Sequence, residues 1–169
     1  MSKTYNVAVI VFPDVEELDF AGVWEALAAT QHMAKEESFR NRTVSVDLGP
    51  VKCAHGLTIL ADEKLTDLAK YDVIVVPGGP GVQRTIKNQH LLDEVKKAYE
   101  SEKLVCSVCT GAFILAKAGI LQGKKATTYH ANLEGLSKYR AVPVRRRVVV
   151  EGKVVTGAGV SASIDVGLK

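Results

Sequence analysis

Cys109 stands between an apolar run at residues 103–108 and a second apolar run at residues 110–118 with the spacing of a helix. A buried strand that passes directly into a helix through small residues is typical of a nucleophile elbow, a strained turn that projects one side chain into a site. Because the N-terminus of a helix favours a thiolate, we expect a lowered pKa for Cys109. The pattern predicts a cysteine nucleophile; the alternative is a small cysteine buried in the core.

The spacing of Cys106 and Cys109 also permits a redox pair. Cys106, however, falls inside the predicted strand, so a bond to Cys109 would disrupt that strand. With Cys53 the chain has 3 cysteines, an odd number. We therefore expect free thiols and no disulfide framework.

A glycine-rich segment, residues 77–81, directly follows the predicted buried strand at residues 72–76. Glycines after a strand let the backbone approach a ligand and expose amide donors. Gly78 and Gly79, together with the amide of Thr110, could form an oxyanion hole. The alternative is a plain tight turn.

Asp19 interrupts a predominantly apolar run at residues 18–29, which predicts a helix buried on most sides. A buried carboxyl group has a raised pKa unless it is paired, which suits a proton donor or acceptor beside a thiolate. Glu16 and Glu17 are expected to be acids of the first helical turn. Asp14 stands where an N-cap belongs, and Glu25 is expected on the surface.

The histidines do not have the spacing of a metal cluster, and we expect no metal site. His130 follows a short strand predicted near residues 126–128, so it either lines the site or is an ordinary surface or core histidine. The four histidines are His32, His55, His90 and His130.

Apolar strands alternate with helical segments along the chain, which predicts an α/β fold. The sheet is expected to be mostly parallel, with helices on both faces, in one three-layer, flavodoxin-like domain over residues 1–169. The segment at residues 160–169 begins like a helix and stops. Strands are predicted at residues 5–12, 43–48, 72–76 and 103–108, helices at 15–36, 91–102, 110–118 and 133–138, and hairpins at 51–61 and 146–156.

The 169 residues carry 22 basic and 19 acidic side chains, a net charge of +3, which gives no basis for a nucleic-acid partner. Three consecutive arginines, Arg145, Arg146 and Arg147, are typical of a solvated face. No apolar run reaches the roughly 18 residues that span a bilayer, and no cleavage-site pattern follows the N-terminus. We therefore expect a cytoplasmic protein with neither a nucleic-acid nor a membrane partner.

These segments together resemble the ThiJ/PfpI superfamily, which has a class I glutamine amidotransferase-like fold. The resemblance runs along the whole chain through VFPDVEELDFAG, VVPGGPGV, VCTGAFILAKAGILQGKKATTYH and VVTGAGVSASIDVGL. Cys-Thr-Gly together with Leu-Asp near the start resembles the isonitrile hydratase branch. The family commonly has His where Tyr129 stands and Pro where Val23 stands, and by the same resemblance the final helix is incomplete.

The resemblance implies a lyase that converts an isonitrile and water into an N-formamide without a cofactor. Cys109 would be the nucleophile, Asp19 the acid/base and Thr110 a substrate or water contact. Gly78 and Gly79 would be amide donors, and Tyr129 and His130 are candidates for the substrate-binding wall. A homodimer acting on a small molecule is implied as well.

The sequence is also compatible with two other functions. One is a glyoxalase or deglycase that acts on α-oxoaldehydes with the same thiol and carboxylate. The other is a ligand- or redox-sensing module related to domains of transcription regulators, against which the sequence shows no helix-turn-helix segment. No histidine-containing protease triad can be assembled from the sequence.

Overall fold

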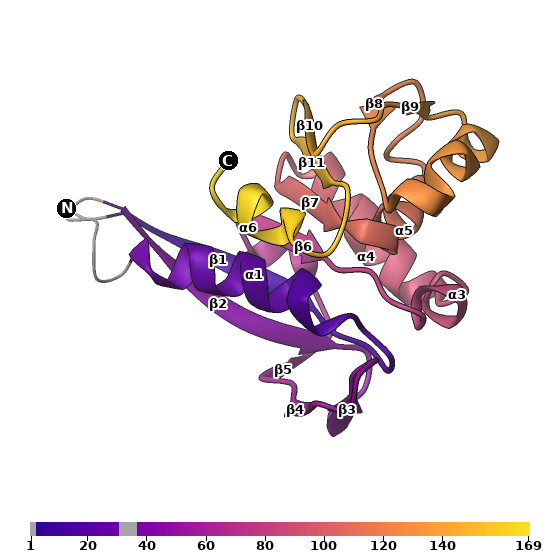
Figure 1. Cartoon of the computed structure of the whole chain (residues 1–169). Coiled ribbons are helices and arrows are strands. Elements are labelled where there is room, and N and C mark those ends of the chain that lie inside the picture. The colour runs from indigo at the N-terminus through magenta and orange to yellow at the C-terminus, as the bar shows by residue number, and fades with distance from the viewer. Residues whose placement is uncertain (1–2, 31–36) are drawn as a thin grey trace.

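A seven-stranded sheet forms the centre of the protein, and the computed structural model describes residues 3–30 and 37–169 (Figure 1). All neighbouring strands run parallel except β10, which pairs antiparallel with β11 at one edge. In sheet order the strands are β10 (Val148–Glu151), β11 (Val154–Gly157), β7 (Leu104–Val108), β6 (Val73–Val76), β1 (Lys3–Ile10), β2 (Glu37–Ser45) and β5 (Glu63–Lys64).

The central strands are apolar because both of their faces are covered. Every residue of β6 and the last four residues of β1 are buried. Figure 1 shows α1 and α6 together on one face of the sheet, with α4 and α5 on the other. The helices are α1 (Glu17–Ala28), α3 (Val82–Thr85), α4 (Gln89–Glu100), α5 (Ala112–Lys117) and α6 (Ala162–Gly167), with 3-10 turns η1 (Leu68–Lys70), η2 (Cys109–Gly111) and η3 (His130–Tyr139).

The predicted fold class, an α/β sandwich with a mostly parallel sheet, is confirmed. The strand succession β2-β1-β6-β7-β11 is the flavodoxin-like order. In such sheets a ligand crevice forms at the carboxyl ends of the strands, where the chain order reverses. Here the reversal lies between β1 and β6.

Two small paired segments lie outside the main sheet. The predicted hairpin around His55 is confirmed as β3 (Pro50–Lys52) and β4 (Thr58–Leu60), and a short parallel pair joins β8 (Lys125–Ala126) to β9 (Val142–Pro143). The predicted hairpin at 146–156 is confirmed as β10 and β11.

Some predicted boundaries are wrong. The strand expected at 43–48 is β2, which begins at Glu37 because its pairing with β1 starts at Lys3. Helix α1 begins at Glu17 with Glu16 as its N-cap, not Asp14. Asp14 has a left-handed backbone, with φ of 61°, and its side chain pairs with Arg84. The last part of the helix expected at 15–36 lies outside the described residues.

The helices of the described residues leave no candidate for a membrane span, since none combines the necessary length with the necessary apolar character.

Candidate functional site

The turn from β7 into α5 has the geometry predicted for an elbow. β7 ends at Val108, and Cys109 has φ of 53°, a left-handed conformation that non-glycine residues rarely adopt. Gly111 is required in this turn, because a Cβ there would lie 2.1 Å from the carbonyl oxygen of Val76 at the end of β6. The neighbouring strand ends thus meet closely at the residue expected to be the nucleophile.

Asp19 is fully buried in α1 and faces the elbow. Its Oδ2 accepts a 2.8 Å hydrogen bond from the amide of Gly78. Its Oδ1 is buried without a hydrogen-bond partner among the described residues. One oxygen is therefore fixed by the backbone, and the other is available for a proton.

The pKa of Asp19 is raised to about 7, mainly because burial penalises the charged carboxylate. The hydrogen bond from Gly78 opposes this rise, the charge of Glu16 adds to it, and the Cys109 thiol lowers it again. A carboxyl group with a pKa near neutrality can both accept and donate a proton under ordinary conditions.

The expected lowering of the Cys109 pKa is wrong for the resting site. Burial, followed by the negative charge of Asp19, raises the pKa of the Cys109 thiol to about 12. The backbone N–H and the hydroxyl of Thr110 oppose this rise but do not overcome it. Residues 112–117 form a helix of under two turns, and a nearby carboxylate offsets its terminal amides. A reaction at this sulfur would therefore have to include removal of the thiol proton.

The amides of Gly78 and Gly79, expected as oxyanion donors, both donate to side chains of the protein. The amide of Gly78 holds Asp19, and that of Gly79 donates a 3.0 Å hydrogen bond to Oγ1 of Thr110. A Cβ at Gly78 would lie 2.6 Å from the nitrogen of Thr110. The two glycines thus position Asp19 and Thr110 while allowing the backbone segments to approach each other.

A cleft of about 740 Å³ opens beside Cys109 and Thr110. Tyr129 forms part of its wall. His130 is exposed, and its ring lies 4.4 Å from the Tyr129 ring, outside the set of residues that line the cleft. The other walls are mixed in character: Glu16, Gly79, Pro80, Val82, Gln83, Ile86, Phe113, Ala131, Asn132, Gly135, Lys138, Tyr139 and Val160.

Glu16 and Thr128 are two site residues that sequence reasoning missed. Glu16 precedes α1, lines the cleft and raises the pKa values of both Asp19 and Cys109. Thr128 is buried and donates a 2.6 Å hydrogen bond to the carbonyl oxygen of Cys109. The two consecutive threonines of the segment ATTYH were the sequence signal that could have indicated Thr128. Polar side chains that are buried after a short strand need hydrogen-bond partners nearby.

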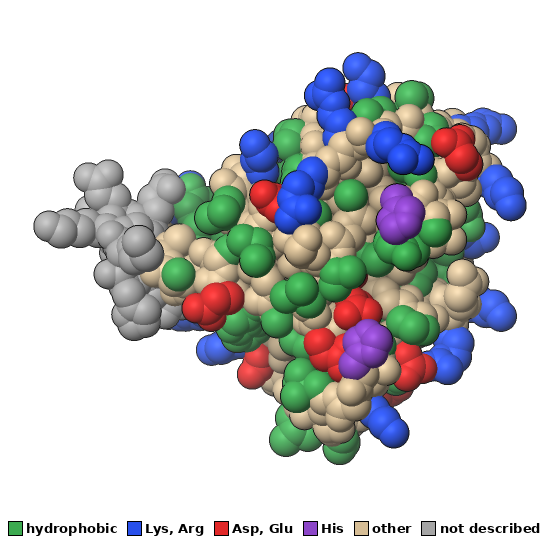
Figure 2. Space-filling model, in the orientation of Figure 1, with side chains coloured by type: hydrophobic (Ala, Val, Ile, Leu, Met, Phe, Trp, Pro, Cys, Tyr) green, Lys and Arg blue, Asp and Glu red, His purple; other side chains and the backbone are tan. Residues whose placement is uncertain are grey.

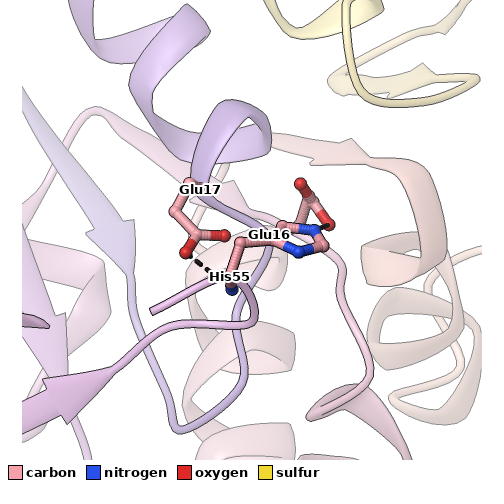
Figure 3. Close-up of side chains that lie close together, drawn as sticks. All are labelled: Glu16, Glu17 and His55. Atoms are coloured by element: carbon pink, nitrogen blue, oxygen red, sulfur yellow. Dashed lines mark hydrogen bonds and ion pairs between the residues drawn. The ribbon is translucent and has the colours of Figure 1, made fainter. Parts of the chain in front are cut away.

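Glu16, Glu17 and His55 form a further group of titratable side chains where the β3–β4 hairpin meets the start of α1 (Figure 3). His55 Nε2 lies 3.1 Å from Glu16 Oε2, and Glu17 Oε1 accepts a 2.8 Å bond from the backbone N–H of His55. One possible metal-ligand atom from each of the three residues lies within 4.8 Å of those from the other two. The spacing of the histidines in the sequence did not predict this group. We interpret the group as an anchor that joins the hairpin turn to α1.

The fold and the elbow define a class of α/β protein in which a cysteine follows a central parallel strand. The model of the DJ-1/PfpI family matches residues 5–169, and the chain belongs to this family.

Three known proteins illustrate the relationship. The chain is 36% identical over 163 residues to an isonitrile hydratase from Pseudomonas putida, covering 96% of this chain and 69% of that protein. It is 28% identical over 127 residues to a deglycase from Pyrococcus furiosus, covering 74% of this chain and 76% of that protein. The crystal structure of a ThiJ/PfpI family protein from Pseudomonas syringae superposes with a TM-score of 0.87 at 28% identity, covering 99% of this chain and 67% of that one.

Proposed function

We propose that this protein is a cysteine-dependent enzyme that hydrates isonitriles to N-formamides, with Cys109 as nucleophile and Asp19 as acid/base. The observation that carries the proposal is the buried Asp19 carboxyl, with a pKa of about 7, beside a thiol on a strained elbow at the cleft. The similarity to an isonitrile hydratase supports the choice of substrate.

In the first step Asp19 accepts the thiol proton as the sulfur of Cys109 attacks the terminal carbon of the isonitrile. A C–S bond forms, and the lone pair left on carbon takes the proton back from Asp19. The product of this step is a thioformimidate bound to the enzyme. Because Asp19 is ionised in an appreciable fraction of molecules near pH 7, it can act as the base without a metal ion or a cofactor.

In the second step water adds to the thioformimidate carbon, and the nitrogen takes up a proton. The C–S bond then breaks and the hydroxyl proton passes to the sulfur, which releases the N-formamide and returns Cys109 to its thiol form. Thr110 lines the cleft, and its hydroxyl is bonded to the amide of Gly79, so it is placed to contact the substrate or the attacking water.

The test is hydration of a simple alkyl isonitrile, followed as formamide formation. The natural protein should show turnover, and Cys109→Ala should show none. Cys106→Ala is the control: it removes the buried cysteine inside β7 and should retain turnover. Persisting turnover in Cys109→Ala would show that Cys109 is not the nucleophile. Absence of turnover in the natural protein would refute the isonitrile substrate.

A deglycase or glyoxalase activity on α-oxoaldehydes is the second candidate, supported by the similarity to a protein named a deglycase. The same thiol and carboxyl group would serve it. Formation of lactate from methylglyoxal distinguishes it from isonitrile hydration. A peroxide-sensing role is less well supported, because peroxide reacts with thiolates and the pKa of Cys109 is raised to about 12.

A homodimer is part of the proposal, with the surface formed by α1 and α6 as its interface. Figure 2 shows hydrophobic side chains on the face that these helices present. Leu18, Ile164 and Leu168 are exposed there, at 41%, 48% and 72%. They border an apolar groove that runs between the two helices, a composition typical of surfaces that bind another protein chain.

A further inference from the structure

The segment that follows β8 is fixed from two sides by buried hydrogen bonds. The backbone N–H of Thr127 donates a 2.9 Å bond to Oγ1 of Thr156 in β11. The hydroxyl of the next residue, Thr128, donates a 2.6 Å bond to the carbonyl oxygen of Cys109. Both Thr127 and Thr128 are 1% exposed, so neither bond competes with bulk water.

The Cys109 carbonyl and the Thr110 N–H belong to a single peptide unit. Such a unit is planar and trans, so its carbonyl and its N–H point in opposite directions. The carbonyl accepts bonds from the hydroxyl of Thr128 and from the backbone N–H of Ala112. On the opposite side, the N–H of Thr110 faces the sulfur of Cys109 and stabilises its ionised form. Fixing the carbonyl therefore fixes the direction of this donor.

The strain at Cys109 makes this restraint necessary. A residue with φ of 53° persists in that conformation only where its surroundings hold it there. A hydrogen bond to a carbonyl also polarises the N–H of the same peptide unit, which strengthens the interaction of that N–H with a negative sulfur.

We propose that Thr128 is a positioning residue of the active site: its hydroxyl holds the Cys109–Thr110 peptide unit so that the Thr110 N–H points at the reacting sulfur. This rests on the proposed role of Cys109 as nucleophile and is independent of the identity of the substrate. Thr128 acts through the backbone and does not line the cleft.

Three other groups influence the ionisation of the Cys109 sulfur and stay unchanged in the test. The carboxyl groups of Asp19 in α1 and of Glu16 just before it disfavour the thiolate, and the side chain of Thr110 favours it. A change at Thr128 must therefore act through the peptide unit, because no charge near the sulfur is added or removed.

The experiment measures alkylation of Cys109 by iodoacetamide, located by peptide mass mapping, between about pH 6 and pH 10. Below the pKa of the thiol the rate is proportional to the thiolate fraction. Thr128→Val keeps the shape of the side chain and removes the hydroxyl, and we expect alkylation to slow about tenfold, the effect of one lost hydrogen bond. Thr128→Ser keeps the hydroxyl and should restore the natural rate to within about twofold.

Thr127→Val is the matched control, because Thr127 is equally buried and its bond to Thr156 uses the backbone N–H, which valine retains. Its rate profile should follow that of the natural protein. A Thr128→Val profile that coincides with this control, or a Ser variant as slow as the Val variant, would overturn the proposal. Should the Val variant not fold, Thr128→Ala replaces it, and equal rates for Ala and Ser would contradict the role of the hydroxyl.

Turnover gives a separate readout. With a substrate in hand, Thr128→Val should lower kcat with little change in KM, because the substrate-binding walls are untouched. An unchanged kcat would contradict the proposal. Failure of the natural protein to hydrate isonitriles, in contrast, would refute the proposed reaction and leave the alkylation comparison intact.

Discussion

The amide of Gly78 donates to Oδ2 of Asp19 at 2.8 Å, which ties the loop after β6 to the buried acid of α1. This bond needs a glycine at position 78. A Cβ there would lie 2.6 Å from the Thr110 nitrogen and 2.9 Å from Asp19 Oδ2. The loop after β6, the elbow and α1 thus approach one another so closely at position 78 that there is no space for a Cβ atom.

Gly78→Ala should lower kcat/KM about a hundredfold, because displacement of Asp19 and Thr110 by a fraction of an ångström disturbs the reacting geometry. The control is Gly152→Ala, in a turn where a new Cβ meets no atom within 4 Å. Because Gly152 has a left-handed φ of 61°, alanine there should lower the free energy of unfolding by about 1 kcal/mol and leave kcat/KM unchanged. Equal kinetic effects of the two substitutions would contradict this assignment.

Asp19 should make the protein less stable as the pH rises. Its pKa is about 7 in the folded state against 3.8 ordinarily, so between these values the folded protein retains a proton that the unfolded chain has lost. The contribution of Asp19 to the free energy of unfolding therefore falls by at most roughly 4 kcal/mol as the pH increases from about 4 to about 7. At higher pH this contribution is constant. Urea unfolding at several pH values checks this.

Asp19→Asn provides the comparison for this pH dependence. Asparagine has nearly the shape of the neutral acid and cannot ionise, so its variant should lack this part of the pH dependence. It should be more stable than the natural protein at about pH 8 and similar at about pH 4. Parallel stability curves for the two proteins would show that Asp19 is not the responsible group.

Glu16→Gln should shift the pH profile of kcat/KM to lower pH. The proposed reaction uses Asp19 in its ionised form, so the natural rate should rise through about pH 7. The charge of Glu16 raises the pKa values of both Asp19 and Cys109, and glutamine removes that charge.

Glu17→Gln is the control for the Glu16 substitution, because it removes a neighbouring charge that contributes to neither of these two shifts. Its midpoint should stay near that of the natural protein. If both variants move the midpoint equally, the effect is one of net charge and not of Glu16.

Ile164→Glu should dissociate the proposed dimer, since it places a charge in the exposed apolar face of α6. Light scattering coupled to size-exclusion chromatography measures the change in mass. Val150→Glu changes a residue of β10 that is 54% exposed and should leave the mass unaltered. A dimer that survives Ile164→Glu would exclude this face.

The sequence predicted the parts of the structure that depend on local pattern. Continuous apolar strands and the small residues around Cys109 indicated the sheet and the elbow, because burial on both faces and a sharp turn each restrict residue type. The buried position of Asp19 was predicted from the apolar residues on either side of it. The predictions of the strands, of the elbow and of the buried Asp19 each depend only on residues a few positions apart in the chain.

Features that depend on distant contacts were not predictable in this way. The thiol of Cys109 was expected to be acidic from its place before a helix, yet burial and Asp19, 90 positions earlier, raise its pKa. The amides of Gly78 and Gly79 were expected to be donors to a ligand, and their hydrogen bonds to side chains of α1 and of the elbow were not predicted. Thr128 acquires its proposed role only when its segment packs against β11 and the turn at Cys109.

Gly111 in the elbow lies against the carbonyl of Val76, and β6 pairs with β7 just before the turn, so the conformation of Cys109 depends on the pairing of these two strands. Asp19 and Thr128 reach the same point from opposite halves of the chain. No single segment of the chain holds all of these contacts, because they join residues that are distant in the sequence. The assembly of this site is thus a cooperative property of the whole sheet, and denaturation curves followed by the proposed activity and by circular dichroism should coincide.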